Sequence, residues 1–176
     1  MNEDYSSASS VVKIDINTNL IIETYDVGLG PTSLVVDENK VYVARTFYNE
    51  DWIPFYGSSK INGSDITVNN YGLGFACGGS VMKYNNEIYR SYDGGIASLE
   101  SNLDIRTSSR IGSYDQSQVY STEVIGDYIY FGITDYTEMN TVKVVDVNGN
   151  EVSSGIYLLK LTTENQVVSN KITLLR

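Results

Sequence analysis

Short runs of alternating hydrophobic and polar residues fill most of the chain, and turn-forming residues separate the runs. In one hairpin-like stretch, Leu34–Ala44, an apolar run precedes Asp-Glu-Asn and a second run of Val-Tyr-Val-Ala follows. The pattern recurs at Val81–Ser91 and Glu123–Gly132, and more weakly at Leu161–Asn170. Alternation with a period of two, bounded by Asp, Asn and Gly, is typical of strands joined by tight turns. No stretch has a helical period, so the sequence predicts an all-β fold.

A second hairpin pattern lies between these copies. Its copies are Val11–Ile22, Ser58–Val68, Gly95–Ile105 and Thr141–Val152. Two of them contain Asn-Gly, the strongest short hairpin signal. The spacing from Tyr42 to Tyr89 is 47 residues, from Tyr89 to Tyr130 it is 41, and from Tyr130 to Val168 it is 38. Two hairpins per period give four strands per unit, as in the blade of a β-propeller.

The repeat divides the chain into four blade-like, four-stranded units. Three are expected near residues 31–72, 79–112 and 118–155, and segments 11–27 and 157–174 are expected to close a fourth. Residues 1–10 are expected to be a disordered N-terminal segment, and 11–176 a single β-propeller-type domain. The ring could close within one chain, between two chains as a homodimer with a larger ring, or with further sequence. A β-sandwich of short strands is the alternative fold.

The first unit resembles a known repeat. Its matching segments are Val12–Asp15, Leu20–Ile22, Gly28–Pro31, Leu34–Val36 and Val41–Ala44. In this order they are similar to the YVTN-type β-propeller repeat of surface-layer and other extracellular proteins. The likeness covers residues 11–45; Gly78-Gly79 stands where the next Pro turn would be. It implies a propeller with the Pro-led strand innermost and an extracellular or cell-surface location.

The C-terminal part has a second resemblance. Gly155–Asn165, Lys171-Ile172 and the preceding Val144–Gly149 look like the C-terminal sorting domain of type IX secretion, with a shorter segment between the pieces. That resemblance implies a secreted or surface-attached protein, whose tail is a targeting address and not a blade.

The net charge and the hydropathy of the chain disfavour some classes of binding partner. The chain has 22 acidic and 12 basic residues, for a net charge of −10. Nucleic acids and anionic membrane surfaces are disfavoured, because both require a positive face. The longest apolar runs are too short for membrane insertion. Residues 1–10 have neither a basic start nor an apolar segment, so no signal peptide is expected there.

The residue types also bear on catalysis and cofactors. The chain has no histidine, and Cys77 is its only cysteine, so no internal disulfide is expected. No catalytic motif is recognisable, and a non-catalytic role is expected. Asp15-x-Asn17-x-Asn19 and Asp146-x-Asn148-x-Asn150 resemble the start of calcium loops but fall at hairpin turns, where such side chains usually bond their own backbone. We expect no cofactor, with calcium as the alternative.

Aromatic and acidic residues gather in segments expected to open on one face of the blades, above all the stretch 46–57. The candidate ligand-binding residues are Tyr48, Trp52, Phe55, Tyr56, Tyr92, Asp93, Asp135 and Tyr136. Rings and carboxylates suit a carbohydrate or a protein partner. Alternatively, Trp52 and Phe55 fold back as a cap. The other functions considered are a lyase or glycosidase with Asp93 and Asp135 as paired carboxylates, and a structural piece of a surface assembly.

Overall fold

The structure, a computed structural model, describes residues 8–73, 79–115, 118–134 and 140–152, and the backbone alone at 155–162 and 167–174. Within these ranges the regular structure consists of fifteen strands, arranged in five antiparallel sheets. The predicted all-β class is therefore confirmed. Cys77 and the first seven residues lie outside the described residues.

The strands follow one another with short turns between them. The first six are β1 (Ser10–Asp15), β2 (Leu20–Asp26), β3 (Pro31–Asp37), β4 (Lys40–Tyr48), β5 (Pro54–Asn62) and β6 (Asp65–Gly72). The next four are β7 (Val81–Tyr84), β8 (Glu87–Tyr92), β9 (Gly95–Leu99) and β10 (Ile105–Ile111). The last five are β11 (Val119–Ile125), β12 (Tyr128–Thr134), β13 (Asn140–Asp146), β14 (Gly155–Thr162) and β15 (Val167–Leu174).

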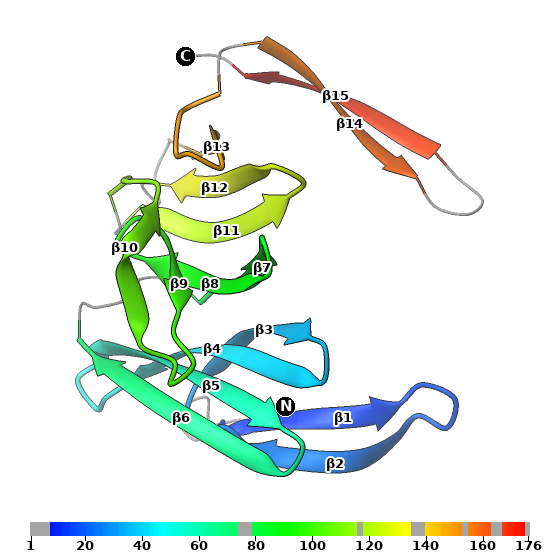
Figure 1. The fold of residues 1–176 in the computed structure, drawn as a ribbon, viewed down its shortest axis with the longest axis vertical. Coiled ribbons are helices and arrows are strands. Elements are labelled where there is room, and N and C mark those ends of the chain that lie inside the picture. The colour runs from blue at the N-terminus through cyan, green and yellow to red at the C-terminus, as the bar shows by residue number, and fades with distance from the viewer. Residues whose placement is uncertain are drawn as a thin grey trace.

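Three sheets form the middle of the molecule and succeed one another from bottom to top of Figure 1. Two are four-stranded with neighbours in chain order, β3-β4-β5-β6 and β7-β8-β9-β10. The third, β11-β12-β13, has a single bridge between Val145 and Glu151 where a fourth strand would lie. In each sheet, strands that are successive in the chain are antiparallel neighbours.

The two ends of the chain form separate two-stranded sheets, β1-β2 and β14-β15. They lie at opposite ends of the arrangement (Figure 1). The fourth four-stranded sheet expected from segments 11–27 and 157–174 is therefore not formed in this structure. Residues 8–10, expected to be disordered, instead extend the first hairpin: the carbonyls of Ala8 and Ser9 accept bonds from the amides of Gly30 and Val27 at 2.9 and 2.8 Å.

The first hairpin of each middle sheet has a turn of the same length. Two-residue turns separate the pairs Asp37–Lys40, Tyr84–Glu87 and Ile125–Tyr128. Asn85 and Asn86 have φ of 48° and 62°, the conformation of a type I′ turn, which Asn tolerates well. Counting from these turns, Tyr42, Tyr89 and Tyr130 occupy the same station in successive sheets.

The same backbone-to-hydroxyl contact joins neighbouring sheets. The amide of Val81 on β7 donates to Oγ of Ser33 on β3 at 3.3 Å. The amide of Thr122 on β11 donates to Oγ of Ser80, directly before β7, at the same distance of 3.3 Å. Ser33 and Ser80 are each nine residues before the tyrosine of their own sheet, and Val81 and Thr122 are each eight before theirs. The first strands of the three sheets are therefore neighbours and are related by one repeated contact.

The core lies between the sheets. Ile61 packs with Val27 and Val43, against the partly buried Val11 and Tyr25 of the first hairpin. One cluster joins β3–β6 to β7–β10, and includes Ala44, Tyr42, Val81, Ile88 and Leu99. The largest joins β7–β10 to β11–β13, and includes Met82, Tyr89, Ile96, Ile129, Phe131 and Val145. Thus every middle sheet is stabilised by burying apolar side chains against the preceding one.

Candidate functional site

The aromatic segment expected as a loop is a long hairpin. β4 continues to Tyr48 and β5 begins at Pro54, so that only 49–53 forms the turn. Phe47 pairs with Phe55 across the hairpin, and their rings stack with centroids 5.9 Å apart. Aromatic residues favour strands, and cross-strand ring pairs stabilise them. This explains why the strands extend through the segment.

The hairpin tip is held by Asn49. Its Oδ1 accepts bonds from the amides of Asp51 and Ile53 at 3.1 and 2.8 Å, and its carbonyl accepts one from Trp52 at 3.0 Å. Trp52 adopts φ of 60°, a left-handed conformation that the surrounding bonds maintain. These bonds give the tip a defined shape.

Two aromatic side chains project from this tip. Trp52 is 80% exposed and Tyr48 50% exposed, and their ring centroids lie 6.1 Å apart at an interplanar angle of 50°. Trp52 therefore does not fold back as a cap. Phe55 is partly buried beneath the tip, against Phe47. The structure thus brings Tyr48 and Trp52 together as an exposed aromatic pair on a protruding turn.

The base of the hairpin rests on a buried arginine that the sequence analysis missed. Arg45 is almost fully buried, and Nη1 and Nη2 donate to the carbonyls of Leu29 and Asn69 at 3.2 and 3.1 Å. Nη2 also donates to the side chain of Asn70, and Cζ lies 5.5 Å from the ring centroid of Phe47. Burial lowers the pKa of Arg45. Its contacts fix β4 just before the aromatic pair.

A second buried arginine, Arg90 on β8, contacts strand β5 of the same hairpin. Its Nη1 donates to the carbonyl of Gly57 and, at 2.9 Å, to Oγ of Ser58, both on β5. Cζ lies 5.1 Å from the ring centroid of Tyr71, whose hydroxyl donates to the carbonyl of Leu103 at 2.5 Å. Burial lowers the pKa of Arg90 and raises that of Tyr71. Arg90 thus ties the second sheet to the hairpin strand.

The remaining predicted site residues do not join the exposed pair. Tyr56 and Tyr92 are partly buried. The carboxylate of Asp93, at the β8–β9 turn, forms an ion pair with Arg110 on β10. Asp135 and Tyr136 lie outside the described residues. Among the described residues, the predicted face of rings and carboxylates is reduced to Tyr48 and Trp52, with Glu50 and Asp51 exposed between them in sequence.

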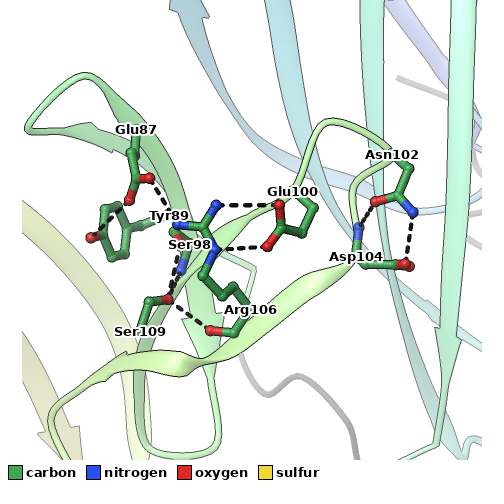
Figure 2. A network of polar contacts seen from close by, with 8 residues as sticks. All are labelled: Glu87, Tyr89, Ser98, Glu100, Asn102, Asp104, Arg106 and Ser109. Atoms are coloured by element: carbon green, nitrogen blue, oxygen red, sulfur yellow. Dashed lines mark hydrogen bonds and ion pairs between the residues drawn. The ribbon is translucent and has the colours of Figure 1, made fainter.

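A polar network crosses the second sheet (Figure 2). Arg106 on β10 donates through Nε and Nη2 to the two carboxylate oxygens of Glu100 at 2.7 and 3.2 Å, and through Nη1 to Glu87 at 2.9 Å. These bonds lower the pKa of Glu100 and raise that of Arg106. Beside it, Ser98 and Ser109 share a hydroxyl–hydroxyl bond of 2.9 Å. Paired in this way, Arg106 links β10 to Glu87 on β8 and to Glu100 directly after β9.

The two candidate calcium turns use their carboxylates locally. Oδ1 of Asp15 accepts the amides of Asn17 and Thr18 at 2.8 and 3.1 Å. Oδ1 of Asp146 accepts the amides of Asn148 and Asn150, both at 2.9 Å. Backbone bonds lower the pKa of Asp15, and bonds from Asn150 lower that of Asp146. Within the described ranges no three metal-binding side chains converge; calcium binding stays a prediction.

An open cleft of about 890 Å³ separates the β1–β2 hairpin from the β3–β6 sheet. Its walls include Leu34, Val36 and Ile66, and its charged residues are Glu38 and the pair Lys13 and Glu23, which lie 3.3 Å apart. The cleft therefore combines apolar walls with polar and charged groups at its rim. The aromatic tip is the better-defined candidate site.

Comparison with protein-family models and with curated proteins found no match to this chain. In the part of the chain that the structure describes, no helix is long and apolar enough to cross a membrane.

Proposed function

We propose that this chain is a non-catalytic β-propeller-type module that binds a protein partner through the tip of the β4–β5 hairpin. The observation on which the proposal rests is Trp52, 80% exposed at a turn whose shape is set by Asn49. Exposing a large ring on a fixed turn has no benefit for folding. Trp and Tyr are the residues most enriched among interface hot spots.

The propeller part of the proposal is supported by the repeated contact between sheets. Two hydrogen bonds at equivalent positions, Val81 to Ser33 and Thr122 to Ser80, relate three successive sheets. In a propeller, blades follow one another around an axis and their first strands lie innermost. Neighbouring first strands in β3, β7 and β11 are what this arrangement requires.

A protein partner is favoured over a carbohydrate by the shape of the tip. Sugar sites usually combine a ring with converging polar groups in a hollow. Here Tyr48 and Trp52 stand on a projecting turn, and Asp93, the predicted acidic neighbour, is engaged by Arg110. A projecting aromatic pair suits insertion into an apolar pocket of another protein.

The proposed location of the module is outside the cell or at the cell surface. An extracellular or cell-surface setting is supported by the resemblance of residues 11–45 to YVTN repeats. A propeller-type lyase or glycosidase would need Asp93 freed from Arg110. Under the proposed function, the module contributes recognition and not chemistry.

The proposal is tested by comparing binding of wild type and variants on two arrays, one of glycans and one of secreted and surface proteins from the same organism. Trp52→Ala and Tyr48→Ala should each weaken binding to a protein target about 10-fold or more. Ile16→Ala, which removes another highly exposed apolar side chain at a hairpin turn, should leave it unchanged. Binding that survives both aromatic substitutions, or binding to glycans alone, would contradict the proposal.

A further inference from the structure

Among the described residues, two apolar faces at opposite ends of the molecule are not covered by another sheet. The back face is defined by Ile14 and Ile21 on the β1–β2 hairpin. The front face consists of Ile125, Tyr128 and Val142 on β11–β13. All five side chains are exposed, between 43% and 61%. Clustered exposed apolar residues on sheets are typical of interaction surfaces.

Both faces occupy positions that are buried elsewhere in this chain. Lys13-Ile14-Asp15 corresponds to Lys60-Ile61-Asn62 in the hairpin pattern; Ile14 is 51% exposed, whereas Ile61 is 3% exposed against the preceding hairpin. The back face is thus the surface that a middle sheet buries against its predecessor.

The front face has the same relation to the second sheet. Val142 pairs with Gly132, two residues after Tyr130, as Ile96 pairs with Ser91, two residues after Tyr89. Val142 is 55% exposed, whereas Ile96 is fully buried against the third sheet. The front face is therefore the surface that a middle sheet buries against its successor.

Front and back are consequently the two halves of an interface that the chain already forms between its middle sheets. In this structure they cannot meet within one chain, because the first and last hairpins form separate sheets at opposite ends (Figure 1). A second copy of the chain presents both halves at once. Two copies related by a two-fold axis would bury both fronts against both backs.

Strand edges fit the same arrangement. Among the described residues, β1 pairs only with β2, and β15 only with β14. If β15 of one copy lay beside β1 of the other, the two hairpins would form a four-stranded sheet in the order β14-β15-β1-β2. This is the antiparallel order of the four-stranded middle sheets. This pairing would also protect edges that otherwise invite aggregation.

We propose that two copies of this chain associate front to back, with β14–β15 of each copy completing β1–β2 of the other. The result is an eight-bladed ring with three sheets from each copy and two shared between them. This inference rests on the propeller arrangement in the proposed function, but not on binding at the hairpin tip. Since each chain has a net charge of −10, added salt should strengthen the association.

The test is the solution mass at micromolar concentration, by sedimentation and by size-exclusion chromatography with light scattering, of wild type, Ile14→Lys and Val142→Glu. Wild type is expected at twice the chain mass of 19.5 kDa, and each variant at the single mass. Ile16→Lys, at the turn of the same hairpin, is the matched control and should pair like wild type. Far-ultraviolet circular dichroism and melting temperature show that the variants remain folded.

Mixing the two variants makes the test specific for front-to-back contact. An Ile14→Lys chain retains an intact front, and a Val142→Glu chain an intact back, so the mixture should recover pairs through one intact interface. A wild-type single chain at all concentrations would overturn the proposal, as would growing open filaments. Pairs that persist in both variants would also overturn it. Tip binding, measured separately with Trp52→Ala, should not change with pairing.

Discussion

Arg90 on β8 donates a hydrogen bond through Nη1 to the backbone carbonyl of Gly57 on β5. Arg45 pairs with Gly57 across β4 and β5, and its guanidinium group lies against this glycine. A side chain at position 57 would collide with it, because a Cβ there would lie 2.4 Å from Nη2 of Arg45. The absence of a side chain at this position therefore lets two buried guanidinium groups converge at the base of the aromatic hairpin. Gly57 therefore contacts both the arginine that supports the aromatic hairpin and the arginine that joins this sheet to the next one.

Replacing Arg90 should destabilise the fold strongly. Arg90→Ala leaves the carbonyl of Gly57 and the hydroxyl of Ser58 without this donor and opens a cavity, so we expect the free energy of unfolding to fall by about 2–5 kcal/mol. Arg110→Ala removes the partly exposed pair with Asp93 and should change it by about 0–1 kcal/mol. Urea denaturation measures both. Equal effects of the two substitutions would contradict the structural role of Arg90.

Asn49 should control the hairpin tip and not the global fold. Asn49→Ala removes the acceptor for the amides of Asp51 and Ile53, so their hydrogen exchange should accelerate, with the global free energy of unfolding changed by about 1 kcal/mol or less. Asn49→Asp keeps a carboxyl oxygen in place and should retain the protection. Unchanged exchange in Asn49→Ala would show that the tip is held by other contacts.

The Arg106 network should make stability depend on acid pH. The pKa of Glu100 is lowered in the folded state, so its contribution is fully present above its unfolded pKa of 4.5 and is lost as pH falls through the lowered value. Glu100→Gln should therefore be less stable than wild type at pH 7, and the difference should shrink in acid. Denaturation midpoints of wild type and Glu100→Gln at pH 7 and at a pH below the lowered pKa measure this difference. Glu50→Gln, at an exposed residue, is the control. A difference that grows in acid would contradict the account.

Tyr114 should make the stability of the fold depend on pH in the alkaline range. Its ring meets Phe131 edge-on at 5.0 Å, and burial raises its pKa to about 12. Among the described residues its buried hydroxyl has no hydrogen-bond partner. Because the folded pKa exceeds the unfolded value of 10.0, this contribution is present below pH 10 and lost as pH rises toward 12.

Tyr114→Phe should therefore match wild type at neutral pH within about 1 kcal/mol, because only an unpartnered hydroxyl is lost. Above pH 10 the variant should lose less stability than wild type. Thermal melts across this range measure the divergence. Parallel curves for the two proteins would mean that Tyr114 does not titrate with a raised pKa.

The hairpins could be predicted from sequence because their signals are local. Asn-rich and Gly-rich turns between alternating runs predict strand pairs, and Tyr42, Tyr89 and Tyr130 each lie two residues after the start of the second strand of such a pair. The length of the aromatic hairpin was missed. Aromatic residues 47–56 were interpreted as loop, although rings are common in strands and Phe47 and Phe55 stabilise each other across the pair.

The burial of Arg45 and Arg90 and the ion pair of Asp93 could not be predicted from the neighbouring sequence. Arg45 and Arg90 look like surface residues in sequence, because their carbonyl acceptors come from segments up to 33 residues away. Asp93 is engaged by Arg110, 17 residues along the chain. Only the sheet order brings these groups together. Of the residues predicted to form the aromatic and acidic face, Tyr48 and Trp52 are exposed, whereas Asp93 is paired with Arg110.

The central claim is that successive sheets are joined by one repeated contact, and amide exchange measured by NMR tests it most directly. Ser33→Ala should accelerate exchange at Val81 and leave Thr122 unchanged, and Ser80→Ala should do the reverse. Matched, separate losses of protection would agree with equivalent sheets about a common axis. Exchange that changes at neither amide, or at both in each variant, would contradict it.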